Sequence, residues 1–293
     1  MDSHNLSPAD DVANAIGRPR LGQMAINIVL ALVALQIAIF VSTNPRFEWS
    51  VVAEYITAAS VLKGLGVSLV LTVVGMTLGT LIGTLLALMK LSAFRTARIF
   101  ASLYTWLFRG TPLLIQLLFW YNLAYLLPNI SIGIPFRPTL VSWDTNELIT
   151  PFIAAVLGLA LNEAAYMTEI MRAGILSVDS RQRDASRALG FTPLKSFLRI
   201  IFPQAMRIVL PPASSQVIGM LKGTSLVSVI AMTDLLFSVQ TIYNRNFKVV
   251  PLLLVAVVWY LAVFSVLTYL QSRLEQRFSR GYVPQTGNGS ANK

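Results

Sequence analysis

The side chains that most often carry acid–base, nucleophilic or metal chemistry are scarce in this sequence. It has no cysteine, and its only histidine is His4, so neither a thiolate site nor histidine catalysis is supported. No glycine-rich segment ends in Gly-Lys-Ser or Gly-Lys-Thr, the phosphate-binding loop that an ATPase needs. We therefore expect no catalytic residue, no metal site and no cofactor in this chain.

Polar residues occur instead within apolar stretches, where ionisable side chains are costly and usually functional. Asn162, Tyr166 and Glu169 recur at intervals of four and three, so they share one face of a helix, with Glu163 beside them. Asn162 and Glu163 are candidates for lining a polar cavity. Glu169 has a simpler explanation, because it can pair with Arg172 three residues further on.

A second polar interruption is the segment Lys222-Gly223-Thr224-Ser225, which divides another apolar run. A helix broken at membrane depth is tolerated where it lines a cavity, and the freed backbone groups with Lys222 suit a zwitterionic or anionic solute. Thr224 and Ser225 would line the same cavity. The alternative is that Lys222 pairs with an acidic side chain of a neighbouring helix. Arg109, beside Gly110 and Pro112, marks a further kink or irregular helix start, and we expect its side chain to reach interfacial water or a carboxylate.

The composition indicates that these candidates lie in a membrane protein. Of 293 residues, 55% are hydrophobic and 12% are charged, and the mean hydropathy is +0.66. This is more apolar surface than one soluble core can hide, so we expect the lipid bilayer as part of the solvent. The net charge of +10 is spread over short loops rather than gathered on a polar domain, which argues against nucleic-acid binding.

Several stretches approach the ~20 apolar residues that a membrane span requires. There are six, at about residues 24–41, 66–89, 100–127, 149–171, 212–239 and 250–269. With the N-terminus inside, sixteen Lys and Arg fall in or beside the cytoplasm and five fall outside, so both termini are predicted to be cytoplasmic. The predicted fold is an all-α membrane protein with about six transmembrane helices.

Two segments have further patterns. Gly75, Gly79 and Gly83 form a flat face for close helix approach, either to a helix of the same chain or to a second subunit. The longest outer segment, Pro128 to Thr150, contains three prolines that limit helix formation, and we expect it to fold over the mouth of the protein.

The long inner loop between the fourth and fifth spans is patterned as two short helices. Asp179 is a possible N-cap of the first, and Gly190 suits its left-handed C-cap. Thr192 caps the second, Pro193 occupies its first position, and Pro203 is expected to end it. The second helix has one apolar stripe, which either rests on lipid headgroups or packs on protein: Leu194, Phe197, Leu198 and Ile201.

Within this loop the order is Asp184-Ala185-Ser186, three residues, Gly190, nine residues, Ile200, one residue, and Phe202-Pro203. The spacing resembles the EAA loop of ABC importer permeases, which reads Glu-Ala-Ala, three, Gly, nine, Ile, one, Leu-Pro. Asp184, Ser186 and Phe202 depart from that pattern but keep its charge, small size and apolar character. Supporting segments are Phe108 to Pro112, Glu163 to Glu169, Pro203 to Arg207, Pro211-Pro212 and Lys222 to Ile230.

The resemblance is greatest to the permeases of polar amino acid importers, and it implies a five-helix type I permease core at residues 60–280 with a coupling loop at 179–203. Outside that core lie a cytoplasmic tail at 1–23, an extra membrane helix at 24–41 and a disordered tail at 281–293. The fixed points of the docking loop would be Asp184, Ala185, Ser186, Gly190, Ile200 and Pro203.

The implied function is ATP-driven import across a bacterial inner membrane by alternating access. The chain would form half of the pathway with a second permease subunit, identical or related. A cytoplasmic ABC ATPase dimer would bind ATP and Mg²⁺ and grip the loop, and an external solute-binding protein would deliver the amino acid.

Two other functions are compatible with parts of the sequence. An ion-gradient-driven secondary transporter would use Glu163 and Glu169 as a proton relay, and a membrane anchor would use the loop to recruit a soluble enzyme. The first leaves the spacing of the loop unexplained, and the second gives no reason for a polar break at Lys222.

Overall fold

The computed structural model describes residues 21–132 and 141–279. The predicted C-terminal tail, 281–293, lies outside these ranges, as do residues 1–20 of the predicted N-terminal tail. The chain divides between Trp49 and Ser50 into two compact units, which are described separately.

The first unit contains helix α2, Leu21–Thr43, followed by the 3₁₀ turn η1, Pro45–Phe47. Along α2 no side chain of the apolar window is buried, which is what a helix surrounded by lipid requires. Asn44 accepts a hydrogen bond from Arg46 N at 3.0 Å and so starts the turn. Phe47 stacks on Trp49 with 5.9 Å between ring centroids, and this aromatic pair closes the unit.

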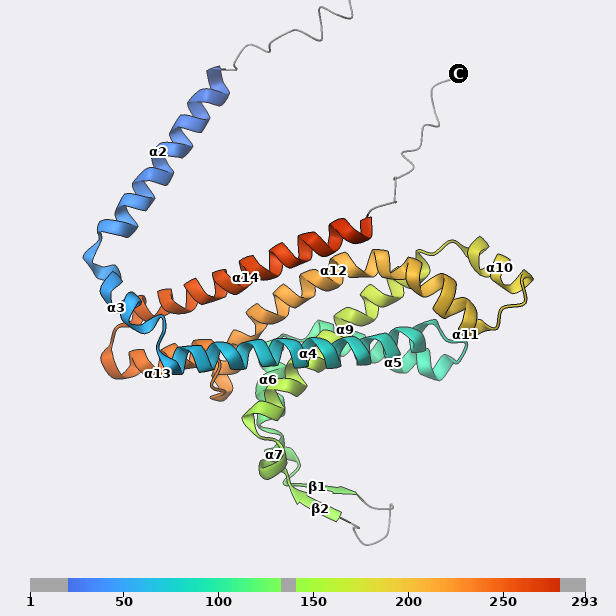
Figure 1. Cartoon of the computed structure of the whole chain (residues 1–293). Helices are drawn as coiled ribbons and strands as arrows, with labels where there is room; N and C mark the ends of the chain where they lie inside the picture. Colours follow the sequence, from blue (N-terminus) through green and yellow to red (C-terminus); the bar gives the residue numbers. More distant parts are fainter. Residues whose placement is uncertain (1–20, 133–140, 280–293) are drawn as a thin grey trace, which may run out of the picture. The chain divides into compact units, whose positions relative to one another are not determined.

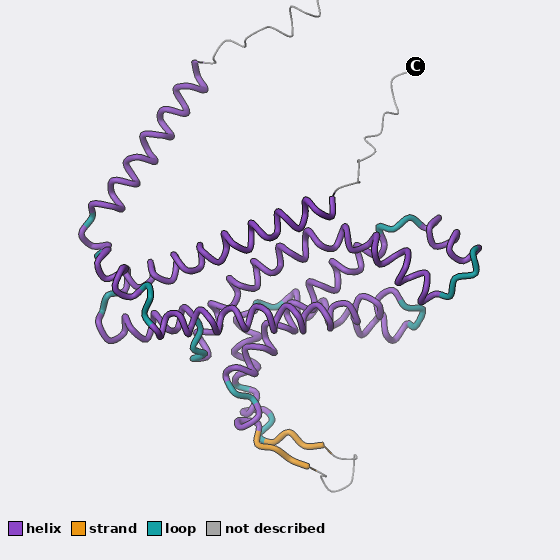
Figure 2. The backbone as a smooth tube through the Cα atoms, in the orientation of Figure 1, coloured by secondary structure: helices purple, strands orange, loops and turns teal. Residues whose placement is uncertain are grey.

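The second unit is predominantly helical (Figures 1 and 2). Its elements are α3 (Trp49–Tyr55), α4 (Ala59–Leu91), α5 (Arg95–Gly110), α6 (Leu113–Tyr121), α7 (Leu123–Leu126), β1 (Asn129–Ile132), β2 (Val141–Asp144), α8 (Thr145–Leu148), α9 (Pro151–Leu176), α10 (Ser180–Ala188), α11 (Pro193–Ser196), η2 (Phe197–Ile201), α12 (Phe202–Gly223), η3 (Thr224–Ile230), α13 (Leu235–Asn246) and α14 (Val249–Ser279). Figure 1 shows α10 and α11 at one end of this unit, with α3 and α13 at the other.

Four described helices, α2, α4, α9 and α14, are long and apolar enough to cross a membrane, and the bent run from Pro193 to Asn246 would make a fifth. The predicted third span, 100–127, is divided: α5 has 16 residues and α6 has 9, with Thr111 and Pro112 between them. Proline lacks the N–H that would continue α5, so the chain starts a new helix there. The all-α membrane fold is confirmed, but the count of six helices is not.

The packing of α4 against α9 is the most extensive between any two described elements. A Cβ added at Gly79 would lie 2.8 Å from Glu163 Cβ, and one at Gly83 would lie 2.7 Å from Met167 Cβ. Only glycine therefore allows the two helices to approach this closely. The predicted flat glycine face is confirmed, and the helix packed against it belongs to the same chain.

Separate apolar clusters hold the two ends of the second unit. At the end that holds α3 and α13, which we call the outer end after its predicted side of the membrane, α4, α13 and α14 enclose Val61, Leu235 and Leu252. Asp234 caps α13 there, accepting hydrogen bonds from Leu236 N and Phe237 N. At the inner end Ile175, Val178, Ile201 and Ala205 bring the end of α9 against η2 and α12. The loop that follows α9 is therefore anchored to the bundle.

The outer segment departs from the all-α expectation. Strands β1 and β2 pair antiparallel, with Asn129 opposite Asp144 and Ile132 opposite Val141. Thr145 is buried, and its hydroxyl bonds to Leu127 O, which fixes the hairpin beside α7. Prolines 135 and 138 lie outside the described residues.

We predict that Gly83→Ala lowers the stability of the second unit. The added methyl would also lie 2.8 Å from Ala164 O, so α9 must shift, and overpacking of this kind costs about 1–3 kcal/mol. Gly66→Ala is the matched control on the same helix, because nothing lies within 4 Å of a Cβ at that position. Heating in detergent followed by size-exclusion chromatography should give a lower melting temperature for Gly83→Ala alone; equal melting temperatures would contradict the packing described.

Candidate functional site

The first helix of the inner loop, α10, begins at the predicted cap. Asp179 Oδ1 accepts a hydrogen bond from Arg181 N at 2.9 Å, which satisfies one free donor of the first turn. The Arg181 side chain also donates to Asp179 Oδ2, and these hydrogen bonds lower the pKa of the Asp179 carboxyl below its usual value. The capping carboxylate is therefore ionised at neutral pH.

Gly190 ends α10 as expected. Its φ of 73° is in the left-handed region, where side chains with a Cβ are strained. Gly190 N donates to Arg187 O, and Phe191 N donates to Ser186 O, so the carbonyls of the last turn are satisfied. A Cβ at this position would meet nothing within 4 Å, so the backbone angle alone requires glycine.

The second helix begins as predicted but does not end as predicted. The Thr192 hydroxyl accepts from Lys195 N, and Pro193 occupies the first position of α11. The prediction that Pro203 ends this helix is wrong. The five-residue π-helical turn η2 leads directly into α12, which includes Pro203 in its first turn. Hydrogen bonding already changes register in a π turn, so the missing proline N–H does not stop the helix.

Two contacts missed in the sequence fix α10 to its neighbours. Arg183 Nη2 donates to Ile175 O at 3.1 Å and to Val178 O at 3.3 Å, so its charge lies at the C-terminal end of α9. Ser186 is buried, and its hydroxyl lies 2.6 Å from that of Ser196. The serine that replaces the family's alanine could have signalled this contact, because a buried hydroxyl needs a partner.

The apolar stripe of the second helix is divided between two surroundings. Phe197 and Ile201 pack with the inner cluster at the end of α9. Leu194 and Leu198 are 68% and 54% exposed, and Leu189 of the neighbouring turn is 73% exposed. We refer to these three exposed leucines of the loop together as the leucine surface.

Of the remaining predicted loop residues, Asp184 and Ala185 are exposed on α10, and Ile200 is half-buried. The charged partner nearest to Asp184 within the described chain is Arg187, whose Nη1 lies 4.0 Å from Asp184 Oδ1. Both side chains are largely exposed, so this pair leaves the carboxylate accessible to another protein.

Among the residues predicted to lie in the membrane, Asn162 forms hydrogen bonds that hold the helix break between α5 and α6. Its amide donates to Phe108 O at 3.1 Å and to Gln116 Oε1 at 3.3 Å, while Gln116 Nε2 donates to Phe108 O and Thr111 O. These bonds satisfy carbonyls that the break between α5 and α6 frees inside the membrane. Gln116, which is buried, was missed in the sequence.

The cations near the helix breaks lie over aromatic rings. Arg109 Cζ is 5.5 Å from the centroid of Tyr166, and Lys222 Nζ is 5.0 Å from that of Phe264. Neither cation has an ion pair with a described residue. The part of the chain that the structure describes therefore gives no support to the alternative that Lys222 pairs with a carboxylate of a neighbouring helix.

The other polar groups of the broken segment bond to their own helix. Thr224 Oγ1 donates to Leu221 O, and Ser225 Oγ donates to Lys222 O, both at 2.7 Å. These hydroxyls satisfy carbonyls at the change from α12 to η3.

The two predicted carboxylates of α9 differ in their surroundings. Glu163 is 6% exposed, lies against Gly79, and its Oε1 has no hydrogen-bond partner among the described residues. Glu169 pairs with Arg172 at 2.9 Å, as the spacing predicted, and also with Lys90 of α4 at 2.5 Å. Two cations thus neutralise Glu169, whereas no cation within the described ranges neutralises Glu163.

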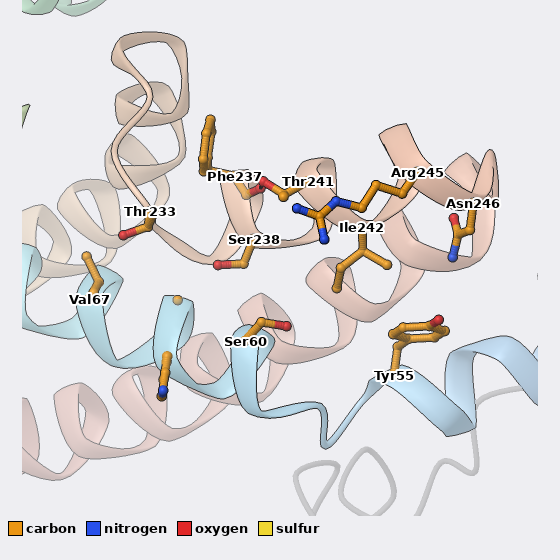
Figure 3. A pocket seen from close by; sticks show the side chains of 12 residues that line it. Tyr55, Ser60, Val67, Thr233, Phe237, Ser238, Thr241, Ile242, Arg245 and Asn246 are labelled. Atoms are coloured by element: carbon orange, nitrogen blue, oxygen red, sulfur yellow. Dashed lines mark hydrogen bonds between the residues drawn. The ribbon is translucent and has the colours of Figure 1, made fainter.

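A cavity of about 670 Å³ lies at the outer end, between α3, the start of α4 and α13 (Figure 3). Ser60 and Val67 of α4 face Ser238 and Thr241 of α13, and the Arg245 side chain extends back toward Thr241. Lys63 also lines the cavity, and no carboxylate of the described chain does.

Comparison with known proteins adds the following. The family model described as binding-protein-dependent transport system inner membrane component matches residues 79–280. The arginine transport system permease protein ArgU of Corynebacterium glutamicum is 39% identical over 261 residues, 88% of this chain and 80% of the relative. The glutamate/aspartate import permease protein GltK of Escherichia coli is 34% identical over 232 residues, 79% and 98% of the two chains.

Two solved structures with a similar fold are also chains of ABC transporters. A chain of an amino acid ABC transporter determined with histidines is 34% identical, with a TM-score of 0.63 over 74% of this chain and 94% of its own length. A chain of the MetNI methionine ABC transporter in an inward-facing conformation is 16% identical, with a TM-score of 0.61 over 75% and 97%. The second likeness concerns the fold alone.

We predict that Asn162→Leu destabilises the protein, because it leaves buried carbonyl and amide groups at the α5–α6 break without their donor. The expected loss is about 1–3 kcal/mol, the cost of an unsatisfied buried polar group. The control Asn122→Leu removes an amide that donates to Leu118 O within the preceding turn of an exposed surface. Thermal unfolding in detergent should separate the two variants, and an unchanged melting temperature for Asn162→Leu would disprove its role at the break.

Proposed function

The chain belongs to the family of binding-protein-dependent transport system inner membrane components, and we propose that it is the transmembrane permease subunit of an ATP-driven importer of polar amino acids. The family match and the relatives named for arginine and for glutamate and aspartate support this function. The chain is a transport subunit, so ATP and Mg²⁺ are bound and ATP is hydrolysed by a separate ATPase.

The observation that carries the proposal is the built surface of the inner loop. The leucine surface, Leu189, Leu194 and Leu198, is exposed on the same loop as the accessible carboxylate of Asp184. Exposed leucines with a charge on the same loop are what a partner protein buries, with the leucines as anchors and the carboxylate available to a basic residue. The ATPase dimer is the partner assigned to this surface, with Ala185, Ile200 and Pro203 as part of its support.

The way the loop is attached explains how the motor's movement would reach the membrane. Arg183 bonds to the end of α9, and Ser186 bonds to Ser196 at the start of the run that becomes α12. A displacement of the loop is therefore applied to α9 and α12 together. Because α9 is packed against the glycine face of α4, the movement continues into the bundle.

The solute path we propose follows the polar side chains at membrane depth. The groups that we assign to a solute are the buried carboxylate of Glu163, whose Oε1 has no partner among the described residues, the half-exposed phenol of Tyr166 and the exposed ammonium group of Lys222. Asn162, Thr224 and Ser225 belong to the same path but act on the backbone, where they satisfy the carbonyls at the two helix breaks. A zwitterionic solute fits groups of both charges.

The ion-gradient alternative is not favoured. A proton relay through Glu169 requires a carboxylate that is free to exchange a proton, but Glu169 is already in ion pairs with Lys90 and Arg172. Relatives in the family are named as permeases of ABC or binding-protein-dependent transport.

The chain lies in the inner membrane, and we place both termini on the cytoplasmic side. Its proposed partners are the ATPase dimer, a second permease subunit, identical or related, and an external solute-binding protein. The two permeases together form the path and open it alternately to either side. The extra helix predicted at 24–41 falls within α2, in the first unit, and the proposed core at 60–280 falls within the second.

We predict that Gly190→Val detaches the ATPase, whereas Gly190→Asn retains it. Valine is β-branched and strained at a φ of 73°, so α10 loses its end and the leucine surface is displaced; asparagine tolerates the left-handed region. Affinity purification of the permease, followed by quantification of the ATPase in the eluate, measures the effect. Equal recovery of the ATPase with both variants would remove the loop from the docking surface.

A further inference from the structure

Arg109 is a charged side chain at an unusual depth. At about 1.5 Å per residue it lies roughly 21 Å along α5 from Arg95, and its ring partner Tyr166 lies roughly 15 Å along α9 from the helix end at Leu176. Both residues are thus far inside a hydrocarbon layer of about 30 Å. Arg109 is exposed at the surface of this chain, and its contact with a described side chain is the ring of Tyr166.

Lipid cannot cover such a position without a large cost, because an arginine in mid-membrane must reach water or an anion. Arg109 has no carboxylate within ion-pair distance among the described residues. The surface that presents Arg109 and Tyr166 must therefore face a water-filled space or an anionic group from outside the chain.

The same surface continues to the inner end of the unit as a groove. Arg98, Ser102, Trp106 and Arg109 follow one another on α5 at intervals of four, four and three, so they share one helical face. The first three line a cavity of about 710 Å³ whose other walls include Lys90 of α4 and two residues of α9, Glu169 and Arg172. Arg109 and Tyr166 lie outside the cavity lining, each three residues from a lining residue of its own helix, Trp106 on α5 and Glu169 on α9. The pair is therefore about one helical turn beyond the cavity, and we call the cavity and this extension together the groove.

The groove is strongly cationic. Three cations line the cavity, namely Lys90, Arg98 and Arg172, and the carboxylate that the described residues place there is that of Glu169. Arg109 adds a fourth cation about one helical turn beyond the lining. Arg98 is held in place by Ser92 O and Ala93 O, with bonds of 3.0 and 2.9 Å to its Nη1, so its charge is fixed at the groove's inner mouth. A low-dielectric cleft lined by one sign of charge attracts solutes of the opposite sign.

We propose that the groove between α5 and α9 is the cytoplasmic half of the solute path and that Arg109, stacked on Tyr166, binds the carboxylate of the solute. The inference rests on the proposed function and adds to it the group that is recognised. A carboxylate is common to all amino acids, so this contact can bind any of them. Selection among side chains must then take place at another site. The remaining cations then lower the energy of the carboxylate along its way to the cytoplasm.

Because the sequence has no cysteine, a single introduced thiol reports the access of water to the groove. Ser102→Cys places the thiol in the groove, and Leu85→Cys is the matched control, because Leu85 is 59% exposed on α4 at a similar depth, outside the lining of the cavity. Inside-out vesicles holding the whole importer are treated with the membrane-impermeant sulfonatoethyl methanethiosulfonate. The thiol of Ser102→Cys should react several-fold faster than that of Leu85→Cys, and equal rates would overturn the water-filled groove.

The charge of the groove is tested with two reagents and one further variant. The measured quantity is the ratio of the reaction rate with the anionic sulfonate reagent to that with its cationic trimethylammonium analogue, divided by the same ratio for free cysteine. For the thiol of Ser102→Cys this value should exceed one, because the cations of the groove attract the anionic reagent. Adding Arg109→Gln should lower it. Arg109→Gln should also reduce amino acid uptake by roughly tenfold or more, with partial recovery in Arg109→Lys, which keeps the charge. Wild-type uptake in Arg109→Gln, or an unchanged reagent preference, would overturn carboxylate binding by Arg109.

One alternative occupant is a carboxylate of the second permease subunit. If that carboxylate is the partner of Arg109, the variant Arg109→Gln should cause the two permease subunits to dissociate and should leave the reagent preference unchanged. This result would overturn the proposal. Thiol reactivity requires no transported solute. A wild-type importer that takes up no amino acid would therefore count against the proposed function while the labelling still reports on the groove.

Discussion

Glycines 75, 79 and 83 carry no side chain, so the backbone of α4 lies directly against side chains of α9, among them Glu163 and Met167. This close approach sets the spacing of the second unit. With the helices this close, Glu163 is buried against α4, and Lys90 can reach Glu169 near the inner end. The helix that carries the polar membrane face is thus fixed against its neighbour along most of its length. Any movement of α9 must then occur as a body, which is the property a mechanically driven transporter needs.

The parts of the fold that depend on near neighbours could be predicted from the sequence. The apolar runs indicated membrane helices, and the caps at Asp179 and Gly190 were predictable because each depends on residues within one turn. The end at Pro203 was wrong, because the π turn before it alters the hydrogen bonding that proline would interrupt. The third span divides at Pro112, where Gln116 and Asn162 form hydrogen bonds with groups at the break. No local sequence pattern predicts Asn162 as a partner, because it lies on another helix.

The site residues that were missed have partners more than one helical turn away, on another element of the loop or on another helix. Arg183 looked like one more loop cation, yet it caps the end of α9. Ser196 mattered only once Ser186 was seen to be buried beside it. Arg109 was placed at a helix kink, but its spacing gives no sign of Tyr166, which lies on another helix. The proposed docking surface and the proposed polar path are joined by α9, so in this proposal the two sites are two ends of one mechanical element.

The central claim is that this chain converts work done on its inner loop into movement of a solute. The most direct test reconstitutes the importer with its co-purifying ATPase and binding protein in proteoliposomes, oriented so that ATP can be enclosed on the ATPase side. Uptake of radiolabelled L-arginine, L-glutamate and L-cystine is then measured with ATP or with a proton or sodium gradient alone. Uptake of at least one of them that requires ATP and the binding protein is the predicted result. Uptake driven by a gradient without ATP would contradict it.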